Sequence, residues 1–403
     1  MQVTISRGRA VGRVSAPPSK SMAHRALICA ALCEGKSVIR GVSESEDMRA
    51  TVDCLSALGA TLVREGNTVT VEGFDPRRVT PKASLFCRES GSTLRFLIPI
   101  ALLSSHSVIL RGEPSLMRRP MQIYAGICKE KGLYFQQNEC DVTVRGPLTA
   151  GEYVLAGNVS SQFISGLLFA LPLCWGDSLI KLTPPIESRS YIDLTLASLA
   201  EFGVHAEWRD GETLFIEGGQ SYRAHDTVVE GDYSNAAFLD ALTLLGGEVE
   251  VEGLLGESLQ GDRIYTEYFK RIQEGAPTLE IGNCPDLGPI LFSMAALHHG
   301  ATFTGTRRLR IKESDRVECM AQELAKIGVA VKATENTVTV DPTALHAPTK
   351  PFDAHNDHRI VMSMAVLCTH FGGSVRGAEA VRKSYPDFFN TLRSLELEVY
   401  ENE

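Results

Sequence analysis

The segment SKSMAHRALICAALCEGKSVIRG, residues 19–41, contains one complete copy of the pattern on which the chain is built. A polar turn at residues 19–21 precedes an apolar stretch from Met22 to Cys33, which is followed by Gly35 and a short strand that ends at Gly41. Polar residues before an apolar run and a glycine after it are the usual start and stop signals of a helix. Because the run is apolar nearly all round, the helix is predicted to be buried.

The same pattern returns five more times. Its polar turns lie at residues 90–93, 160–162, 232–235, 285–286 and 356–359. Its stops lie at Gly35, Ser105, Gly176, Gly247, Gly300 and Gly373, which are 70, 71, 71, 53 and 73 residues apart. A nearly constant period is the signature of a fold assembled from repeated units, and one interval is short.

A second, amphipathic helix and a two-strand hairpin complete the predicted unit. Residues 51–58, 196–202 and 319–327 show helical spacing, end near a glycine and precede strands with alternating side chains. The unit is therefore predicted to be βαβαββ, with the second helix facing solvent. Six such units in 403 residues predict an α/β protein with two domains of about 200 residues, each with three units.

Each buried helix offers a polar N-terminus with unpaired N–H groups and partial positive charge, which suits anions. Capping by Ser, Asp or Asn explains any one of these starts. It does not explain the basic residues at or near them, which are Lys20, Arg25, Arg95, Arg118, Arg119, Arg189, Lys312, Arg316, Arg359 and Lys383. Clustered cations predict an anionic ligand or carboxylate partners.

Carboxylates also occur at these turns, at Asp286, Glu313 and Asp315. One or two acids among many cations could act as a general acid or base. A salt-bridge network is the alternative, and spacing alone leaves the two interpretations open.

Composition narrows the class of protein. The 44% of hydrophobic residues are enough for a sizeable core, and the net charge of −9 argues against binding to nucleic acids or anionic membranes. Ten scattered cysteines without a Cys-x-x-Cys pair favour a reducing cytoplasm. The longest apolar run, residues 163–175, is shorter than the roughly 20 residues of a membrane span, and no signal peptide is recognisable.

Two familiar motifs are absent. The triplet at residues 35–37 resembles the end of a P-loop, but Ala30 stands where that motif needs its first glycine. The histidine pairs at 298–299 and 355/358 lack a third ligand at metal spacing, so no metal site is predicted.

With these motifs, the chain resembles the 5-enolpyruvylshikimate-3-phosphate (EPSP) synthase family over essentially its whole length. The resemblance rests on nine segments in the family's order, at residues 18–25, 89–95, 118–120, 160–162, 188–191, 285–286, 312–316, 357–359 and 383–387. It implies an inside-out α/β fold with buried parallel helices. Residues 14–224 are expected to form the N-terminal domain, and residues 1–13 with 225–403 the C-terminal domain, with the active site in the cleft between them.

The resemblance implies a 3-phosphoshikimate 1-carboxyvinyltransferase of chorismate and aromatic amino acid biosynthesis. Such an enzyme transfers the enolpyruvyl group of phosphoenolpyruvate (PEP) to the 5-hydroxyl of shikimate 3-phosphate and releases phosphate. The two substrates are the expected partners, with no cofactor, no metal, no nucleic acid and no membrane. A cytoplasmic monomer is expected.

The matching positions imply roles for individual residues. The expected catalytic residues are Lys20, Asp286 and Glu313, with Asp286 as base and Lys20 and Glu313 around C3 of PEP. Shikimate 3-phosphate is expected to contact Lys20, Ser21, Arg25, Ser160, Ser161, Gln162, Ser188, Tyr191, Asp286 and Lys312. PEP is expected to contact Lys20, Gly91, Arg95, Arg119, Gln162, Arg316, Arg359 and Lys383.

The sequence departs from the family at Glu89 and Ser92, where asparagine and threonine are common, and at Arg308, where an asparagine often helps to bind the sugar phosphate. These changes are expected to affect affinity and the sensitivity to glyphosate, the family's inhibitor, more than the reaction. Two rivals stay open. One is the sister enzyme that acts on UDP-N-acetylglucosamine, and the other is a non-catalytic sugar-phosphate-binding protein on the same scaffold.

Overall fold

A computed structural model describes residues 1–79 and 83–402. The chain forms two compact units, which we call the N-terminal unit (Pro18–Glu230) and the C-terminal unit (Met1–Pro17 with Gly231–Glu403). The boundaries follow Pro17 and Glu230, whereas the sequence placed them after residues 13 and 224. No helix in the described ranges is both long and apolar enough to cross a membrane.

The first helix of every repeat is present and buried, as predicted. The N-terminal unit contains α1 (Lys20–Ala31), α3 (Gly91–Ala101) and α6 (Ser161–Ala170). The C-terminal unit contains α8 (Tyr233–Leu244), α10 (Gly288–Leu297) and α12 (His358–Phe371). Residues 23–31 of α1 are all buried, which its lack of a polar face requires. A 3-10 turn, η4 (Pro285–Leu287), precedes α10.

The second helices lie outside the first ones. They are α2 (Glu46–Leu58), α5 (Gln122–Lys131), α7 (Arg189–Glu201), α9 (Tyr265–Glu274), α11 (Arg316–Ala325) and α13 (Phe388–Ser394). α2 and α11 begin several residues before the apolar pattern does. The side chains of Ser45 and Asp315 cap their first turns and allow these earlier starts.

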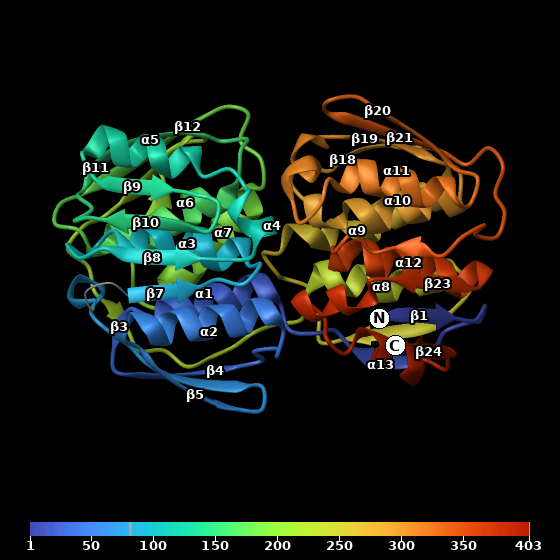
Figure 1. The fold of residues 1–403 in the computed structure, drawn as a ribbon, viewed down its shortest axis with the longest axis horizontal. Coiled ribbons are helices and arrows are strands. Elements are labelled where there is room, and N and C mark those ends of the chain that lie inside the picture. The colour runs from blue at the N-terminus through green and yellow to red at the C-terminus, as the bar shows by residue number, and fades with distance from the viewer. Residues whose placement is uncertain (80–82, 403) are drawn as a thin grey trace. The chain divides into compact units, whose positions relative to one another are not determined.

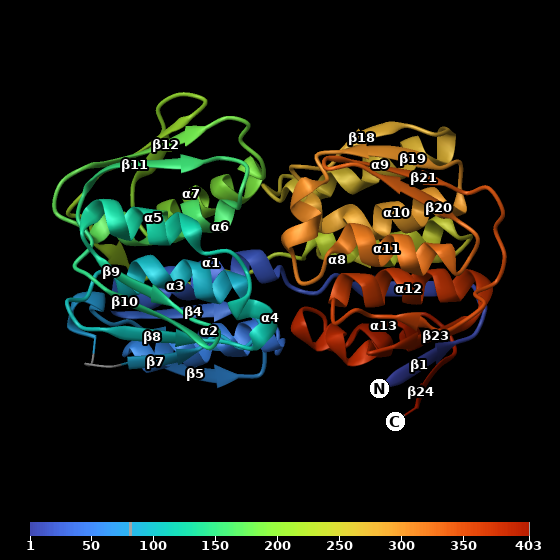
Figure 2. The same cartoon turned by 45° about the horizontal axis from the view of Figure 1, so that its top comes forward.

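In residues 18–79 and 83–230, three four-stranded sheets enclose the buried helices (Figures 1 and 2). One sheet has the order β16 (Thr227–Val228), β4 (Lys36–Arg40), β6 (Thr68–Glu72), β5 (Thr61–Glu65). The second is β7 (Ala83–Phe86), β8 (Val108–Arg111), β10 (Asp141–Arg145), β9 (Tyr134–Gln137). The third is β11 (Gly151–Ala156), β12 (Ser178–Thr183), β14 (Thr213–Ile216), β13 (Ala206–Trp208). Each begins with a parallel pair and continues antiparallel, as the βαβαββ unit requires.

Two short elements complete this unit. The four-residue helix α4 (Pro114–Met117) precedes α5, and the strands β3 (Cys33–Glu34) and β15 (Tyr222–Arg223) form a small parallel pair. Because β15 and β16 pair with strands of the first repeat, the end of the unit returns to its beginning.

The C-terminal unit differs from three equal repeats. One sheet is regular, with the order β18 (Thr278–Glu280), β19 (Ala301–Thr304), β21 (Thr337–Asp341), β20 (Ala330–Ala333). The fourth repeat, in contrast, has no hairpin among the described residues. Its strand β17 (Glu248–Glu252) pairs in parallel with β2 (Val11–Ser15) from the start of the chain. This replacement explains the short interval between Gly247 and Gly300 and corrects the expectation of six identical units.

The last sheet also contains a strand from the start of the chain. Its order is β22 (Phe352–Asp353), β23 (Gly373–Arg376), β1 (Gln2–Ile5), β24 (Val399–Asn402). β1 is antiparallel to both β23 and β24 and supplies the central antiparallel strand. Figure 1 shows the two chain ends side by side on this sheet.

Candidate active site

In the N-terminal unit, the starts of the buried helices carry Lys20 and Ser21 on α1, Gly91 on α3, and Ser161 on α6. Ser90 and Ser160 cap two of these helices through bonds from the N–H groups of Thr93 (3.2 Å) and Gln162 (3.3 Å). The Ser19 side chain makes no such bond at α1, and its hydroxyl has no hydrogen-bond partner among the described residues. Capping therefore accounts for two of the three starts.

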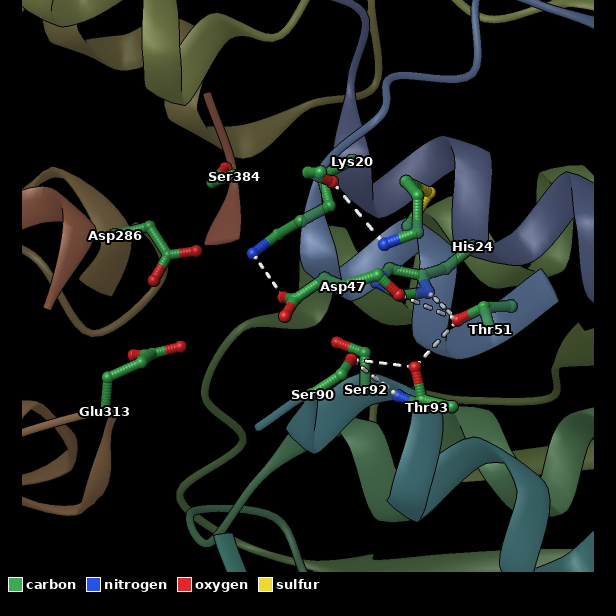
Figure 3. Close-up of polar contacts among 12 residues, drawn as sticks. Lys20, His24, Asp47, Thr51, Ser90, Ser92, Thr93, Asp286, Glu313 and Ser384 are labelled. Carbon is green, nitrogen blue, oxygen red and sulfur yellow. Dashed lines mark hydrogen bonds and ion pairs between the residues drawn. The ribbon is translucent and has the colours of Figure 1, made fainter. Parts of the chain in front are cut away.

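A chain of polar side chains joins α1, α2 and α3 (Figure 3). His24 Nδ1 lies 2.8 Å from Thr51 Oγ1, which lies 2.7 Å from Thr93 Oγ1. Thr93 in turn donates to Ser90 Oγ at 2.7 Å. Burial, then the charges of Lys20 and Arg25, hold the pKa of His24 well below its ordinary value. His24 is therefore a neutral ring that ties the helix starts together.

Lys20 Nζ is 2.8 Å from Asp47 Oδ2 on α2 (Figure 3). The two side chains are only 13% and 12% exposed, so the ion pair is largely removed from water. This contact joins the Lys20 side chain to the first turn of α2. Sequence reasoning missed Asp47, His24 and Thr51, because nothing in the local sequence marks contacts between α1 and α2.

Arg25 is buried and makes bonds to neutral partners. Its Nε donates to Thr195 Oγ1 at 2.8 Å, Nη1 to the Ser21 carbonyl at 2.7 Å and Nη2 to the Tyr191 carbonyl at 2.8 Å. Its guanidinium lies over the Phe96 ring, 5.3 Å from the centroid. Burial lowers the pKa of Arg25 to about 10. These bonds bring together Ser21, Arg25 and Tyr191, which were predicted from two separate motifs.

A second group surrounds Gly91. Arg95 Nη1 donates to Gln162 Oε1 at 2.7 Å, and Gln162 Nε2 donates to Ser92 Oγ at 2.9 Å. A Cβ on Gly91 would lie 2.8 Å from Arg119 Nη1. The structure thus brings Gly91, Arg95, Arg119 and Gln162 together, while their contact with PEP stays a prediction.

Ser188, the residue before α7, has a left-handed φ of 56° and is 1% exposed. It stands three residues before Tyr191, whose carbonyl holds Arg25. Ser160 and Ser161 are 9% and 4% exposed at the start of α6. The described ranges thus place these three serines at the starts of α6 and α7, while their roles toward a ligand stay a prediction.

In the C-terminal unit, Arg316 is the centre of a buried ionic cluster. Its Nε lies 2.8 Å from Asp357 Oδ2, Nη2 lies 2.7 Å from Glu313 Oε2, and Nη1 lies 3.0 Å from Asp286 Oδ1. Burial alone would lower the pKa of Arg316, but Asp357, Glu313 and Asp286 outweigh burial and raise it. Arg316 is therefore a permanent cation.

Asp286 contacts three cations. Besides Arg316, its carboxylate lies 3.2 Å from Lys312 Nζ and 3.1 Å from Arg359 Nη2. Burial lowers the pKa of Lys312 although Asp286 works against this shift. Arg359 also donates to Ser234 Oγ at 3.0 Å, and Lys383 Nζ donates to the Asn356 carbonyl at 2.6 Å. Asp286 and Glu313 thus belong to a salt-bridge network. The sequence had left this interpretation open beside acid–base catalysis.

Three charged residues that the sequence placed near the helix starts, Arg189, Asp315 and Arg118, lie outside the two clusters described above. Arg189 lies over the Trp208 ring at 4.0 Å and donates to the Gly211 carbonyl. Asp315 caps α11 and pairs with Arg310 at 3.4 Å. Arg118 is exposed at the end of α4. Within the described ranges, none of the three bonds to the clusters around Gly91 and Arg316.

The departures from the family pattern also have structural settings. Glu89 Oε1 accepts a bond from Ser115 at 2.5 Å. Arg308 is buried, and its charge contributes to the lowered pKa of Lys312, after the larger effect of burial. Asp357 and Ser234 were missed as site residues; Asp357 stands directly before the His-Arg pair of its motif, which is the signal that could have identified it.

No group of three or more His, Cys, Asp or Glu side chains in residues 1–79 and 83–402 could hold a metal ion. All but two of the ten cysteines are buried; Cys140 is exposed and Cys319 is half-buried.

Known proteins resemble this chain over nearly its whole length. Residues 6–392 match the model of the family described as EPSP synthase (3-phosphoshikimate 1-carboxyvinyltransferase). The 3-phosphoshikimate 1-carboxyvinyltransferase of Clostridium kluyveri is 38% identical over 99% of this chain and 98% of its own length. The enzyme of the same name from Clostridium perfringens is 38% identical over 98% of both chains.

A solved EPSP synthase from Acinetobacter baumannii has a TM-score of 0.79 and 25% identity to this chain, over 99% of this chain and 100% of that one. The family model spans nearly the whole chain, and the structural similarity includes both units. On these findings, the chain belongs to the EPSP synthase (3-phosphoshikimate 1-carboxyvinyltransferase) family.

Proposed function

We propose that this chain transfers the enolpyruvyl group of PEP to the 5-hydroxyl of shikimate 3-phosphate and releases phosphate. The observation that carries the proposal is Asp286, a carboxylate within 3.2 Å of Lys312, Arg316 and Arg359. A base surrounded by cations suits a reaction in which a hydroxyl is deprotonated beside anionic groups.

The N-terminal unit is proposed to bind the sugar phosphate. The buried guanidinium of Arg25 has neutral partners, and Ser160 and Ser161 lie at a helix start, where N–H groups attract phosphate. Ser21, Gln162, Ser188 and Tyr191 complete the proposed set. From the C-terminal unit, Asp286 and Lys312 are proposed to contact the hydroxyls.

PEP is proposed to bind two groups of cations. Arg95 and Arg119 lie around Gly91, where the missing side chain leaves room for a ligand close to the backbone. Arg316, Arg359 and Lys383 belong to the C-terminal unit, and Lys20 and Gln162 are shared with the sugar phosphate. Guanidinium forks match the geometry of both the phosphate and the carboxylate of PEP.

The proposed reaction begins when Asp286 takes the proton of the 5-hydroxyl, whose oxygen attacks C2 of PEP while C3 gains a proton. Loss of phosphate from the tetrahedral intermediate, with a proton from C3, gives the enol ether. Lys20 and Glu313 are proposed to carry out the proton transfers at C3 of PEP. A positioned acid or base accelerates such steps by roughly a hundredfold to ten-thousandfold.

Because the proposed ligands come from both units, we propose that the substrates bind in a cleft between them. Small-angle scattering with and without both substrates tests this step. A smaller radius of gyration with substrates is expected, and an unchanged one argues against closure. We further propose a cytoplasmic monomer; a molar mass near that of one chain by light scattering is the expected result.

The decisive experiment mixes the protein with PEP and shikimate 3-phosphate and measures inorganic phosphate. Release with shikimate 3-phosphate, but not with UDP-N-acetylglucosamine, is expected. Release only with the latter would identify the sister activity. Calorimetric binding of shikimate 3-phosphate without any phosphate release would instead support a non-catalytic binding protein.

A further inference from the structure

The turn before α12 contains two consecutive residues in the left-handed region, His355 (φ 48°) and Asn356 (φ 53°). Neither is glycine, and a left-handed backbone is uncommon for other residues, although asparagine and histidine adopt it more often than most. Such a conformation persists only where surrounding contacts maintain it. The turn lies between β22 and α12, directly before Asp357.

Glu323 on α11 supplies these contacts. Its side chain is 1% exposed, and Oε1 lies 2.7 Å from His355 Nε2. Oε2 accepts the Asp353 N–H at 2.8 Å and lies 2.6 Å from Lys326 Nζ. Lys326 also donates to the Pro351 carbonyl at 3.1 Å. One buried carboxylate therefore fastens both the strand β22 and the turn that follows it.

The other side of the turn faces the ionic cluster. The Asn356 carbonyl accepts the bond from Lys383 Nζ at 2.6 Å, and Asp357 holds Arg316 at 2.8 Å. Asp357 Oδ1 also accepts the N–H of Arg359 at 2.9 Å. A change in the backbone at residues 355 and 356 would thus reorient the groups that hold the Lys383 and Arg316 side chains and the backbone N–H of Arg359.

We propose that His355 is a positioning residue, whose contact with Glu323 fixes the left-handed turn and thereby sets Lys383 and Arg359 for an anionic substrate. The inference rests on the proposed function for the identity of that substrate, PEP. It adds a residue outside the nine segments that carry the family resemblance.

The charge of the imidazole strengthens the contact. A hydrogen bond with the Cys319 thiol, then the bond and charge of Glu323, raise the pKa of His355 to about 10. The ring is therefore an imidazolium at neutral pH. The charged and titratable groups around it are Cys319 and Glu323 on α11, Lys326 just after that helix, and Asp353 on its own segment, whose carboxylate accepts the His355 N–H at 2.7 Å.

The test compares His355→Gly with His355→Gln. Glycine adopts the left-handed turn without strain but has no side chain to contact Glu323, so it separates the contact from the backbone preference. Loss of one charge-assisted bond predicts that His355→Gly raises the KM for PEP about tenfold. The kcat and the KM for shikimate 3-phosphate should change by less than about twofold, because uniform binding energy alone is lost. Glutamine retains a donor and should restore part of the KM.

The matched control is His346→Gln, because His346 is exposed and its ring bonds to the neighbouring Ala347 carbonyl. Wild-type KM values are expected for it. A wild-type KM for PEP in His355→Gly would overturn the proposal, as would an equal fall of kcat in both His355 variants with no change in KM.

Hydrogen exchange of the protein without substrates separates this proposal from the proposed function. Faster exchange at residues 353–359 in His355→Gly, and not in His346→Gln, is expected if the contact fixes the turn. If the wild-type protein releases no phosphate, the proposed function fails, while this readout still tests the turn. Unchanged exchange at these residues would overturn the positioning role even in an active enzyme.

Discussion

The two units treat their buried cations differently. In the N-terminal unit, Arg25 donates to two carbonyls and a threonine, and Arg95 donates to Gln162. In the C-terminal unit, Arg316 contacts three carboxylates, and one of them also contacts Lys312 and Arg359. Among the described residues of the N-terminal unit, exceptions are Lys20, which pairs with Asp47, and the partly buried Arg88, which pairs with Glu46 and Asp53.

The difference shows that a cationic cluster can be prepared for anions in two ways. A buried guanidinium with neutral partners lacks a counter-charge, which a bound phosphate can supply. A guanidinium with internal carboxylates is already neutralised, and its acids are available for proton transfer. The first arrangement favours binding of an anion and the second favours proton transfer, which agrees with the roles proposed for Arg25 and for Asp286 and Glu313.

The largest effect is expected from Asp286→Asn, which keeps the shape of the side chain but removes the proposed base. Turnover should fall by roughly a hundredfold to ten-thousandfold. Glu318→Gln, an exposed acid on α11, is the matched control and should leave turnover unchanged. Phosphate release at saturating substrates measures both. Near-normal turnover of Asp286→Asn would mean that the acid serves only the salt-bridge network.

Replacing one buried arginine in each unit tests the difference between charged and neutral partners, because the two replacements should lower the free energy of unfolding by different amounts. Arg316→Met leaves three carboxylates without their shared cation and should lower the free energy of unfolding by about 3–5 kcal/mol. Arg25→Met leaves only neutral acceptors, so a smaller loss of roughly 1–3 kcal/mol is expected. Urea unfolding, followed separately in each unit by hydrogen exchange, gives both values. Equal losses would remove the distinction between the two kinds of cluster.

Gly91→Ala tests the proposal that the N-terminal unit takes part in binding PEP. The new Cβ would meet Arg119 Nη1 at 2.8 Å, and this flexible end can move at a modest cost. The KM for PEP should rise roughly tenfold with little change in kcat, because about 1–3 kcal/mol is typical of overpacking. Gly126→Ala on α5 is the control, since a Cβ there meets nothing within 4 Å. An unchanged KM for Gly91→Ala would place PEP elsewhere.

The smallest effect concerns one histidine in each unit. Burial lowers the pKa of His24, so the N-terminal unit should lose stability as the pH falls below about 6.5, where the unfolded histidine gains a proton. The pKa of His355 is raised to about 10, first by Cys319 and then by Glu323, so its contribution is complete below about 6.5 and is lost as the pH rises toward 10. Local stability can be measured by hydrogen exchange at several pH values in the wild type, His24→Asn and His355→Gln. In the wild type, the regions around His24 and His355 should show opposite trends with pH, and each variant should lose the trend of its own region. Parallel trends would contradict these opposite environments.

Much of the fold could be predicted because the buried helices are local features. The run from Met22 to Cys33 and its counterparts predicted all six buried helices, and the polar residues before them predicted where the cations gather. The partners of β1 and β2 could not be predicted, because strand pairing over more than 200 residues leaves no local pattern. The missing hairpin of the fourth repeat was visible only as a short interval.

The candidate site was predictable as a set of residues but not as a network. The motifs named Arg316, Asp286 and Glu313, yet spacing could not decide between catalysis and salt bridges. Asp357 and Asp47 were missed because each makes its contact with a different helix, and no local sequence pattern marks such a contact. The roles of all these residues toward substrates stay predictions until the variants above are measured.

The position of β1 between β23 and β24 has a consequence for biosynthesis on the ribosome. The N-terminal unit is one continuous segment and can fold as soon as Glu230 has left the exit tunnel. β1, in contrast, is synthesised long before its partners and must wait for β23 and β24 before its sheet can close. Nascent chains that stop short of Val399 should therefore carry a folded N-terminal unit beside an open, aggregation-prone edge, where a chaperone is needed most.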